Sequence, residues 1–271
     1  MSPEPPPESG PPAGLGPPLE PLPEKPPQPA SPPPESYPFW SYLDLLGFLV
    51  IAVLGSVAEA LLMAALIEVT HVRRVYVLIP AQVLLYAFLL GTLAVIFRRY
   101  YGRPFWQSLR WAPAPWSTSM VVTCGVLAAF GVMVASVLLR TPDTDSPMKA
   151  LLSDPVSIVM LAVIGTTLAP VCEEVIFRGF LQPLLVRSLG AVAGILVTAA
   201  AFGLLHFQEY GNSWRHALLI SAAGAAFGWV RYRTGSTKAA AVMHASYNCV
   251  FFLLLAAQQA ALHGRLVGHG R

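Results

Sequence analysis

Residues 157–183 read SIVMLAVIGTTLAPVCEEVIFRGFLQP, an apolar stretch that carries two adjacent glutamates and an arginine. The stretch is long enough to lie in a lipid bilayer, because a helix needs about 20 apolar residues to cross one. Charged side chains are costly there, at roughly 2.5 to 3.5 kcal/mol for a central Asp, Lys or Arg. We therefore expect Glu173, Glu174 and Arg178 to face other protein groups or water instead of lipid.

The composition of the whole chain points to the same environment. Of its 271 residues, 55% are hydrophobic and only 11% are charged, whereas a soluble domain carries about 25% charged residues. The formal net charge is +3, and no basic stripe is interleaved with aromatic side chains, which argues against nucleic acid as a partner. The sequence thus predicts an integral membrane protein that contacts the lipid bilayer and no nucleic acid.

Apolar runs separated by short polar segments follow one another from about residue 42 onward. The runs cover 42–67, 75–97, 117–139, 156–189, 191–207, 217–230 and 237–262. The fourth run is longer than one crossing needs and contains Pro170 and Pro183, so we expect a kinked or broken helix there. The predicted fold is all-α, a polytopic transmembrane bundle of about seven helices, with a range of six to eight.

The sequence divides into four ranges. Residues 1–38 hold most of the prolines, and such a segment cannot bury enough apolar surface to offset the entropy of ordering, so we expect a disordered tail. Residues 39–150 would form N-terminal transmembrane helices, and residues 151–262 would form the transmembrane core that carries the polar residues. Residues 263–271 would be a short C-terminal tail.

Helical spacing groups the polar residues of the core. Glu174 and Arg178 are four residues apart, so they share a helix face and can pair across one turn. The same spacing recurs on two later segments, in Phe202 with His206 and in His244 with Asn248. Gly224 and Gly228 also lie four apart, a spacing that lets two helices approach closely. Three membrane segments would each bring one polar edge to a common cavity.

These residue types suit the hydrolysis of an amide by water. A carboxylate in surroundings of low dielectric constant can accept a proton from water, and a histidine beside it can hold the same water. A second histidine and an asparagine can donate hydrogen bonds to the oxyanion of a tetrahedral intermediate. Taken singly, each group has a structural interpretation: Glu174 and Arg178 could be a buried ion pair, and His206 a hydrogen-bonded core residue.

The three motifs resemble those of a known family. The segments EEVIFR (173–178), FGLLH (202–206) and HASYN (244–248) match the EExxxR, FxxxH and HxxxN/D motifs of the CAAX protease and bacteriocin-processing family, also called Abi proteins. They occur in the family's order, and the resemblance covers roughly residues 155–255. It implies an intramembrane glutamic endopeptidase; the eukaryotic branch of the family removes the last three residues of prenylated CAAX proteins.

The resemblance also implies a role for each motif residue. Glu173 would be the general base that activates water, and His206 would help to hold that water. His244 and Asn248 would form the oxyanion site. Structural support would come from Glu174, Arg178 and Phe202.

The sequence favours a mechanism without a cofactor. Two Glu and two His could ligate zinc, but no HExxH pair places two ligands on one helical turn, so we expect no metal. The expected partner is a membrane-associated protein or peptide substrate, and the expected location is a multi-pass position in the bacterial inner membrane. The alternative is a non-catalytic membrane scaffold or bacteriocin-immunity protein that uses the same polar cluster structurally. A transporter is disfavoured because no internal repeat is visible.

Overall fold

The computed structural model describes the chain except for residues 2–36, 73–74 and 269–271. The predicted disordered tail at residues 1–38 thus lies almost wholly outside the described residues. All described helices belong to one compact unit, so the helices before and after residue 150 pack together. The prediction of an all-α fold is confirmed, because every regular element in the described part of the chain is helical.

The helices follow the predicted apolar runs. The N-terminal half contains α1 (Tyr42–Thr70), α2 (Val75–Val95), a π-helical turn η1 (Ile96–Tyr100), α3 (Phe105–Ser108), α4 (Thr118–Leu138) and α5 (Pro147–Leu151). The second half contains α6 (Pro155–Thr166), α7 (Leu168–Glu174), the π-helical segment η2 (Val175–Leu181), α8 (Gln182–Leu189), α9 (Ala191–Leu205), α10 (Trp214–Thr234) and α11 (Thr237–Gly268). The last helix continues past the expected end of the core at residue 262.

Fewer helices qualify as membrane spans than the seven apolar runs predict. Among the described residues, four helices are long and apolar enough to cross a membrane, namely α1, α2 with η1, α4 and α11, and the bent pair of α6 with the helix after it makes a fifth. Helix α9 is apolar but has only 15 residues, and α10 is rich in small and charged residues. The chain is nevertheless a multi-pass membrane protein, since these helices present far more apolar surface than a soluble fold exposes.

The fourth run is broken, as its prolines predict, but the break lies before them. Thr167 separates α6 from α7 with a non-helical backbone (φ −125°, ψ −80°). The helical stretch Leu168–Leu189, which begins with α7, is bent by 41° from the direction of α6. Pro170 lies in the first turn of α7, and Pro183 lies at the start of α8. Proline is tolerated in a first turn, because its missing N–H has no partner to lose there.

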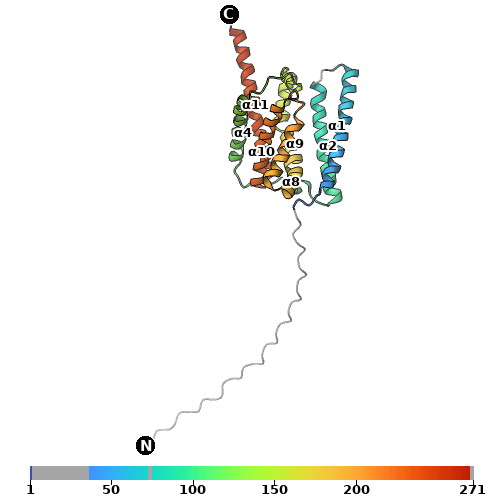
Figure 1. Ribbon diagram of the computed structural model, residues 1–271, viewed down its shortest axis with the longest axis vertical. Helices are drawn as coiled ribbons and strands as arrows, with labels where there is room; N and C mark the ends of the chain where they lie inside the picture. The colour runs from blue at the N-terminus through green and yellow to red at the C-terminus, as the bar shows by residue number, and fades with distance from the viewer. Residues whose placement is uncertain (2–36, 73–74, 269–271) are drawn as a thin grey trace. The chain divides into compact units, whose positions relative to one another are not determined.

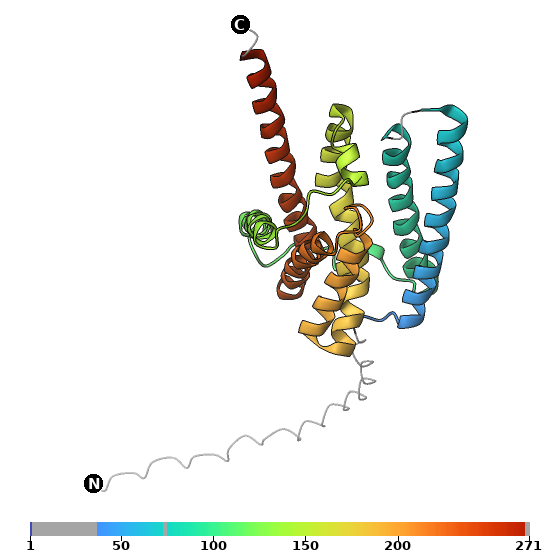
Figure 2. The ribbon, with the colours of Figure 1, turned by 45° about the horizontal axis from the view of Figure 1, so that its top comes forward.

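Helices α1 and α2 form an antiparallel pair beside the rest of the bundle (Figures 1 and 2). Phe48 is the one buried residue of α1, whose leucines and valines are otherwise largely exposed. Such a surface suits a lipid-facing helix. On its other side α2 packs against α7, which brings the N-terminal pair into contact with the segment that carries the two glutamates.

Helices α8 and α9 lie between the α1–α2 pair and the helices α4, α10 and α11 (Figure 1). The close approach predicted from Gly224 and Gly228 is present, because both face the neighbouring helices at very short range. A β-carbon on Gly224 would lie 3.0 Å from Nη2 of Arg178, and one on Gly228 would lie 2.7 Å from Oε1 of Gln182. The small residues of α10 therefore allow long polar side chains of η2 and α8 to reach its backbone.

Candidate active site

Glu174 is the centre of a buried ionic group. Its side chain is fully buried, and its Oε1 accepts hydrogen bonds from Nη1 of Arg178 at 2.8 Å and from Nδ1 of His244 at 3.0 Å. Arg178, also fully buried, donates from Nη2 to the carbonyl oxygen of Gly224. A buried carboxylate is tolerated when it is paired and hydrogen-bonded. The pairing expected from the four-residue spacing is thus present, and it also holds an imidazole of α11.

Glu173 points to a different set of partners, because adjacent positions of a helix diverge by about 100°. Its Oε1 accepts a hydrogen bond of 2.6 Å from the hydroxyl group of Tyr86 in α2. Its Oε2 lies 3.9 Å from Nε2 of His244, a separation that suits a bridging water better than a direct bond. The side chain is 17% exposed, so Glu173, unlike Glu174, reaches solvent.

The two glutamates therefore lie next to different nitrogens of the His244 imidazole, Glu174 next to Nδ1 and Glu173 next to Nε2. Since a carboxylate accepts hydrogen bonds, the Nδ1 of His244 donates to Glu174. The Nε2 then faces Glu173 and is an acceptor in the neutral ring and a donor in the protonated ring. The ring is further fixed by stacking on Phe227, with centroids 4.5 Å apart.

His206 caps the end of α9 and has its tautomer set by its own helix. Its Nδ1 lies 2.8 Å from the carbonyl oxygen of Phe202, and a carbonyl can only accept. The Nδ1 therefore carries the proton, and Nε2 of the neutral ring is left as an acceptor. No direct bond joins His206 to Glu173 among the described residues.

Phe202 is the link between the two histidines. Its ring centroid lies 4.7 Å from that of His206 and 5.8 Å from that of His244. The Arg178 guanidinium lies over the same ring, 4.6 Å from its centroid. One aromatic side chain thus contacts all three of the cationic or potentially cationic groups, which fixes their relative positions.

Asn248 has a contact that the sequence did not predict. Its amide nitrogen donates a 2.7 Å hydrogen bond to the carbonyl oxygen of Gly165 in α6. This bond ties α11 to the broken segment just before Thr167. The amide has a second N–H, so the bond leaves one donor for another partner.

Two residues near the glutamates were not found from the sequence. Tyr86 is 8% exposed and lies in α2, where nothing in the local pattern distinguishes it from an ordinary interfacial tyrosine. Glu209 lies in the loop after His206. Although part of it reaches solvent, its pKa is raised, first by desolvation and then by the negative charge of Glu173, while the charge of His206 acts in the other direction.

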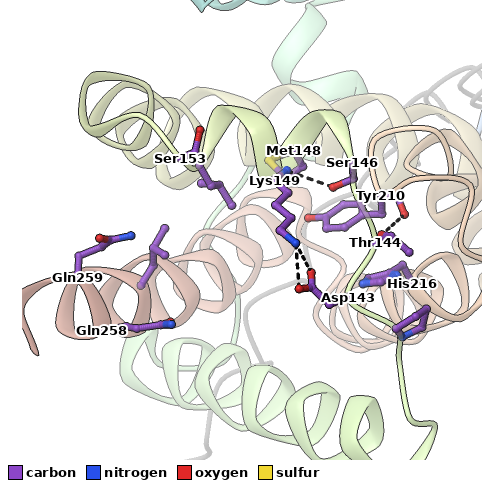
Figure 3. A pocket seen from close by; sticks show the side chains of 13 residues that line it. Asp143, Thr144, Ser146, Met148, Lys149, Ser153, Tyr210, His216, Gln258 and Gln259 are labelled. Carbon is purple, nitrogen blue, oxygen red and sulfur yellow. Dashed lines mark hydrogen bonds and ion pairs between the residues drawn. The ribbon is translucent and has the colours of Figure 1, made fainter. Parts of the chain in front are cut away.

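A hollow of about 440 Å³ lies beyond the loop that carries Tyr210. Figure 3 shows Lys149 extending across it to Asp143, with Tyr210 and His216 on one side and Gln258 and Gln259 on the other. None of the four predicted catalytic residues lines it. In the part of the chain that the structure describes, no group of three or more His, Cys, Asp or Glu side chains is placed to hold a metal ion. Metal independence stays a prediction.

An all-helical membrane bundle with a buried cluster of carboxylates and imidazoles defines the class of protein: a multi-pass membrane protein with a polar site inside its core. Residues 155–250 match the family model described as type II CAAX prenyl endopeptidase Rce1-like. These residues are almost the same as the range 155–255 over which the sequence resembles the family. No curated protein and no solved structure matches the chain.

Proposed function

We propose that this protein is an intramembrane endopeptidase that hydrolyses a peptide bond near the membrane surface with a glutamate-activated water. Glu173 is the general base. It is the more accessible of the two glutamates, and Tyr86 already occupies one of its oxygens. The remaining oxygen lies 3.9 Å from Nε2 of His244, a separation that a water bonded to both atoms from one side would bridge.

The proposed reaction has two steps. Glu173 takes a proton from water, and the oxygen of that water bonds to the carbonyl carbon of the substrate to give a tetrahedral oxyanion. The carbon–nitrogen bond then breaks, and the proton passes from Glu173 to the departing amine, which leaves a carboxylic acid and an amine. His206, with Nε2 free to accept, would hold the second hydrogen of the water.

The oxyanion would be stabilised by His244 and Asn248. When its ring is protonated, His244 would donate from Nε2 while Nδ1 stays bonded to the carboxylate of Glu174, much as the histidine of hydrolytic triads is held by an acidic partner. Asn248 would contribute its second N–H. Arg178 and Phe202 would act through Glu174 and His244, by holding them in place, and would not touch the substrate.

The proposed substrate is a membrane-associated protein or peptide, and a prenylated peptide is the first probe to try because of the family match. The proposed mechanism uses no metal and no cofactor. We also propose the bacterial inner membrane as the location, an inference that rests on the sequence alone.

The observation that carries the proposal is the placement of Glu173 between Tyr86 and His244. To test it, the full chain is reconstituted in lipid vesicles with membrane-anchored peptides, among them one with three residues after a farnesylated cysteine, and products are identified by mass spectrometry. Glu173→Gln should lower the cleavage rate by about 10²- to 10⁴-fold, the usual contribution of a general base. Glu59→Gln, a matched change in α1, should leave the rate unchanged. Equal rates for Glu173→Gln and wild type would exclude Glu173 as the base.

A non-catalytic scaffold is the second candidate, and one feature favours it. Arg178, Gln182 and Asn248 each donate to a backbone carbonyl of another helix, so the polar side chains hold helices together whatever else they do. A scaffold predicts that Glu173→Gln lowers thermal stability and that no anchored peptide is cleaved. A functional site predicts unchanged or increased stability in that variant, because active-site groups are often retained at a cost to stability.

A further inference from the structure

A second hollow, of about 220 Å³, lies where α8 and α10 end and where the chain enters α1. Its lining includes three arginines, Arg178, Arg187 and Arg231, together with Tyr37 and Tyr232. No carboxylate is among the residues that line it. The hollow is therefore a cationic pocket, and Arg178 is the residue that it shares with the buried ionic group of Glu174.

Arg231 is the most telling of these residues because it is buried without a counter-charge. Only 6% of it is exposed. Its Nε donates to the hydroxyl of Thr237 at 2.9 Å and its Nη2 to the hydroxyl of Tyr37 at 3.0 Å, and both partners are neutral. No carboxylate pairs with Arg231 anywhere in the described chain, although buried charges are normally paired.

The neighbouring cations make the pocket more positive. The guanidinium of Arg110 lies 4.1 Å from the centroid of the Tyr37 ring, and that of Arg187 donates to the carbonyl oxygen of Pro38. Across residues 37–72 and 75–268, neither of these two arginines forms an ion pair. Three guanidinium groups thus converge around the segment before α1 with only neutral hydrogen-bond partners.

Arg178 contributes an independent sign of a missing ligand. The residue is fully buried, yet within the described residues its Nε has no hydrogen-bond partner. An unsatisfied buried donor is rare in folded proteins. Arg178 also lines the pocket, so a donor without a partner lies on a residue that borders it.

The location of the pocket indicates the depth at which its ligand lies. Tyr232 lines the pocket and packs against Trp229, and both of these aromatic side chains are more than two-fifths exposed. Such residues concentrate at the level of the lipid headgroups. The same end of the bundle carries the arginines between α2 and α4 and those at the end of α10, whereas Arg140, Lys149 and Arg215 lie at the other end. The positive-inside rule thus favours the cytoplasmic side for the pocket by a small excess of positive charge.

We propose that this pocket binds a phosphate group, supplied by the headgroup of an anionic phospholipid. Arginine forks match phosphate oxygens, and basic pockets between transmembrane helices on the cytoplasmic side bind such headgroups. The volume is below the roughly 300–1,000 Å³ of pockets that enclose whole drug-sized ligands. It fits a phosphate group with the acyl chains left outside in the bilayer.

The test measures lipid binding and needs no enzymatic activity. Full-length protein in micelles is titrated with phosphatidylglycerol, with phosphatidylcholine and, in a separate arm, with inorganic phosphate. Retained lipid is counted by native mass spectrometry, and the midpoint of thermal unfolding is recorded. We expect phosphatidylglycerol to be retained and to raise the midpoint, and phosphatidylcholine to do neither.

Variants decide whether the pocket is responsible. Arg231→Gln and Arg187→Gln should each weaken retention by roughly tenfold or more, the usual effect of losing a hydrogen bond to a charged group. Arg233→Gln is the matched control, because Arg233 lies at the same end of α10, over Trp229 and outside the pocket. If Arg231→Gln does not fold, the test rests on Arg187→Gln, because Arg187 is exposed and its replacement should not prevent folding.

Each outcome has a defined meaning. Loss of retention in the pocket variants and not in the control supports the site, with the lipid as the source. Should inorganic phosphate alone produce the whole arginine-dependent shift, the pocket is a phosphate site but the lipid assignment is overturned. If Arg233→Gln lost as much lipid retention as the pocket variants, the lipid would be attracted to the basic surface in general. If phosphatidylglycerol were retained no better than phosphatidylcholine, there would be no headgroup site. Either result overturns the proposal.

Discussion

Tyr86→Phe is the most informative single change, because it removes one oxygen atom and preserves the buried ring. In the wild-type protein that oxygen donates a 2.6 Å hydrogen bond to Oε1 of Glu173. Tyr86 lies in α2, outside the residues 155–250 that match the endopeptidase family. The variant therefore tests whether the N-terminal helices help to position Glu173, the proposed base.

The expected size of the effect follows from the chemistry of the bond. A hydrogen bond to a charged group contributes about 1.5–3 kcal/mol. If the whole of that contribution orients Glu173 for proton transfer, kcat falls by about 10- to 150-fold, since each 1.36 kcal/mol is a factor of ten in rate. The bond acts on the proposed base, and Tyr86 has no proposed contact with the substrate, so KM should change little.

The assay compares kcat, KM and the midpoint of thermal unfolding for the wild type and two variants in the same vesicles. Tyr100→Phe is the control, because it makes the same atomic change at a side chain that is 81% exposed. We expect Tyr100→Phe to match the wild type in all three quantities. Tyr86→Phe should match it in KM, with a midpoint no more than a few degrees lower.

Two results would refute this reasoning. A folded Tyr86→Phe protein with wild-type kcat would mean that Glu173 needs no orientation from α2. A lower unfolding midpoint at unchanged kcat would mean that the bond serves only to attach α2 to α7.

Three further predictions concern stability, each checked by thermal unfolding in micelles. Glu174→Gln should cost about 3–5 kcal/mol, because it leaves the buried Arg178 without its carboxylate, and adding Arg178→Met should restore much of the loss. Gly224→Ala should destabilise by about 1–3 kcal/mol through overpacking, since its β-carbon would lie 3.0 Å from a guanidinium nitrogen, whereas Gly91→Ala, with open space around it, should be neutral or stabilising. The raised pKa of Glu209 means that the folded state binds its proton more readily than the unfolded state does. This carboxyl therefore lowers the stability of the folded state at pH values above its folded pKa, where it is ionised. It has no such effect below its unfolded pKa, where it is protonated in both states. Glu209→Gln should accordingly raise the unfolding midpoint more at neutral than at acidic pH, and an equal shift at both would contradict the assignment.

The sequence by itself determined the helices, the membrane environment and the family resemblance of residues 155–250. These properties depend on composition and on the order of residues along one segment, which are fully present in the linear chain. The four-residue spacing was sufficient to pair Glu174 with Arg178, because both lie on one helix. The prolines of the fourth run located its break approximately. The break itself is at Thr167, and the prolines lie in the first turns of the helices that follow.

Only the tertiary structure decided which partner each polar group has. The spacing of His244 and Asn248 gives no sign that the first bonds Glu174 and the second bonds Gly165. Tyr86 reaches Glu173 from a helix far away in the sequence, and Arg231 meets Tyr37 across the bundle. Helical periodicity fixes which residues share a face, but the rotation and separation of packed helices fix which faces meet. Those depend on side chains from several segments at once, such as the glycines of α10 that let Arg178 and Gln182 reach its backbone.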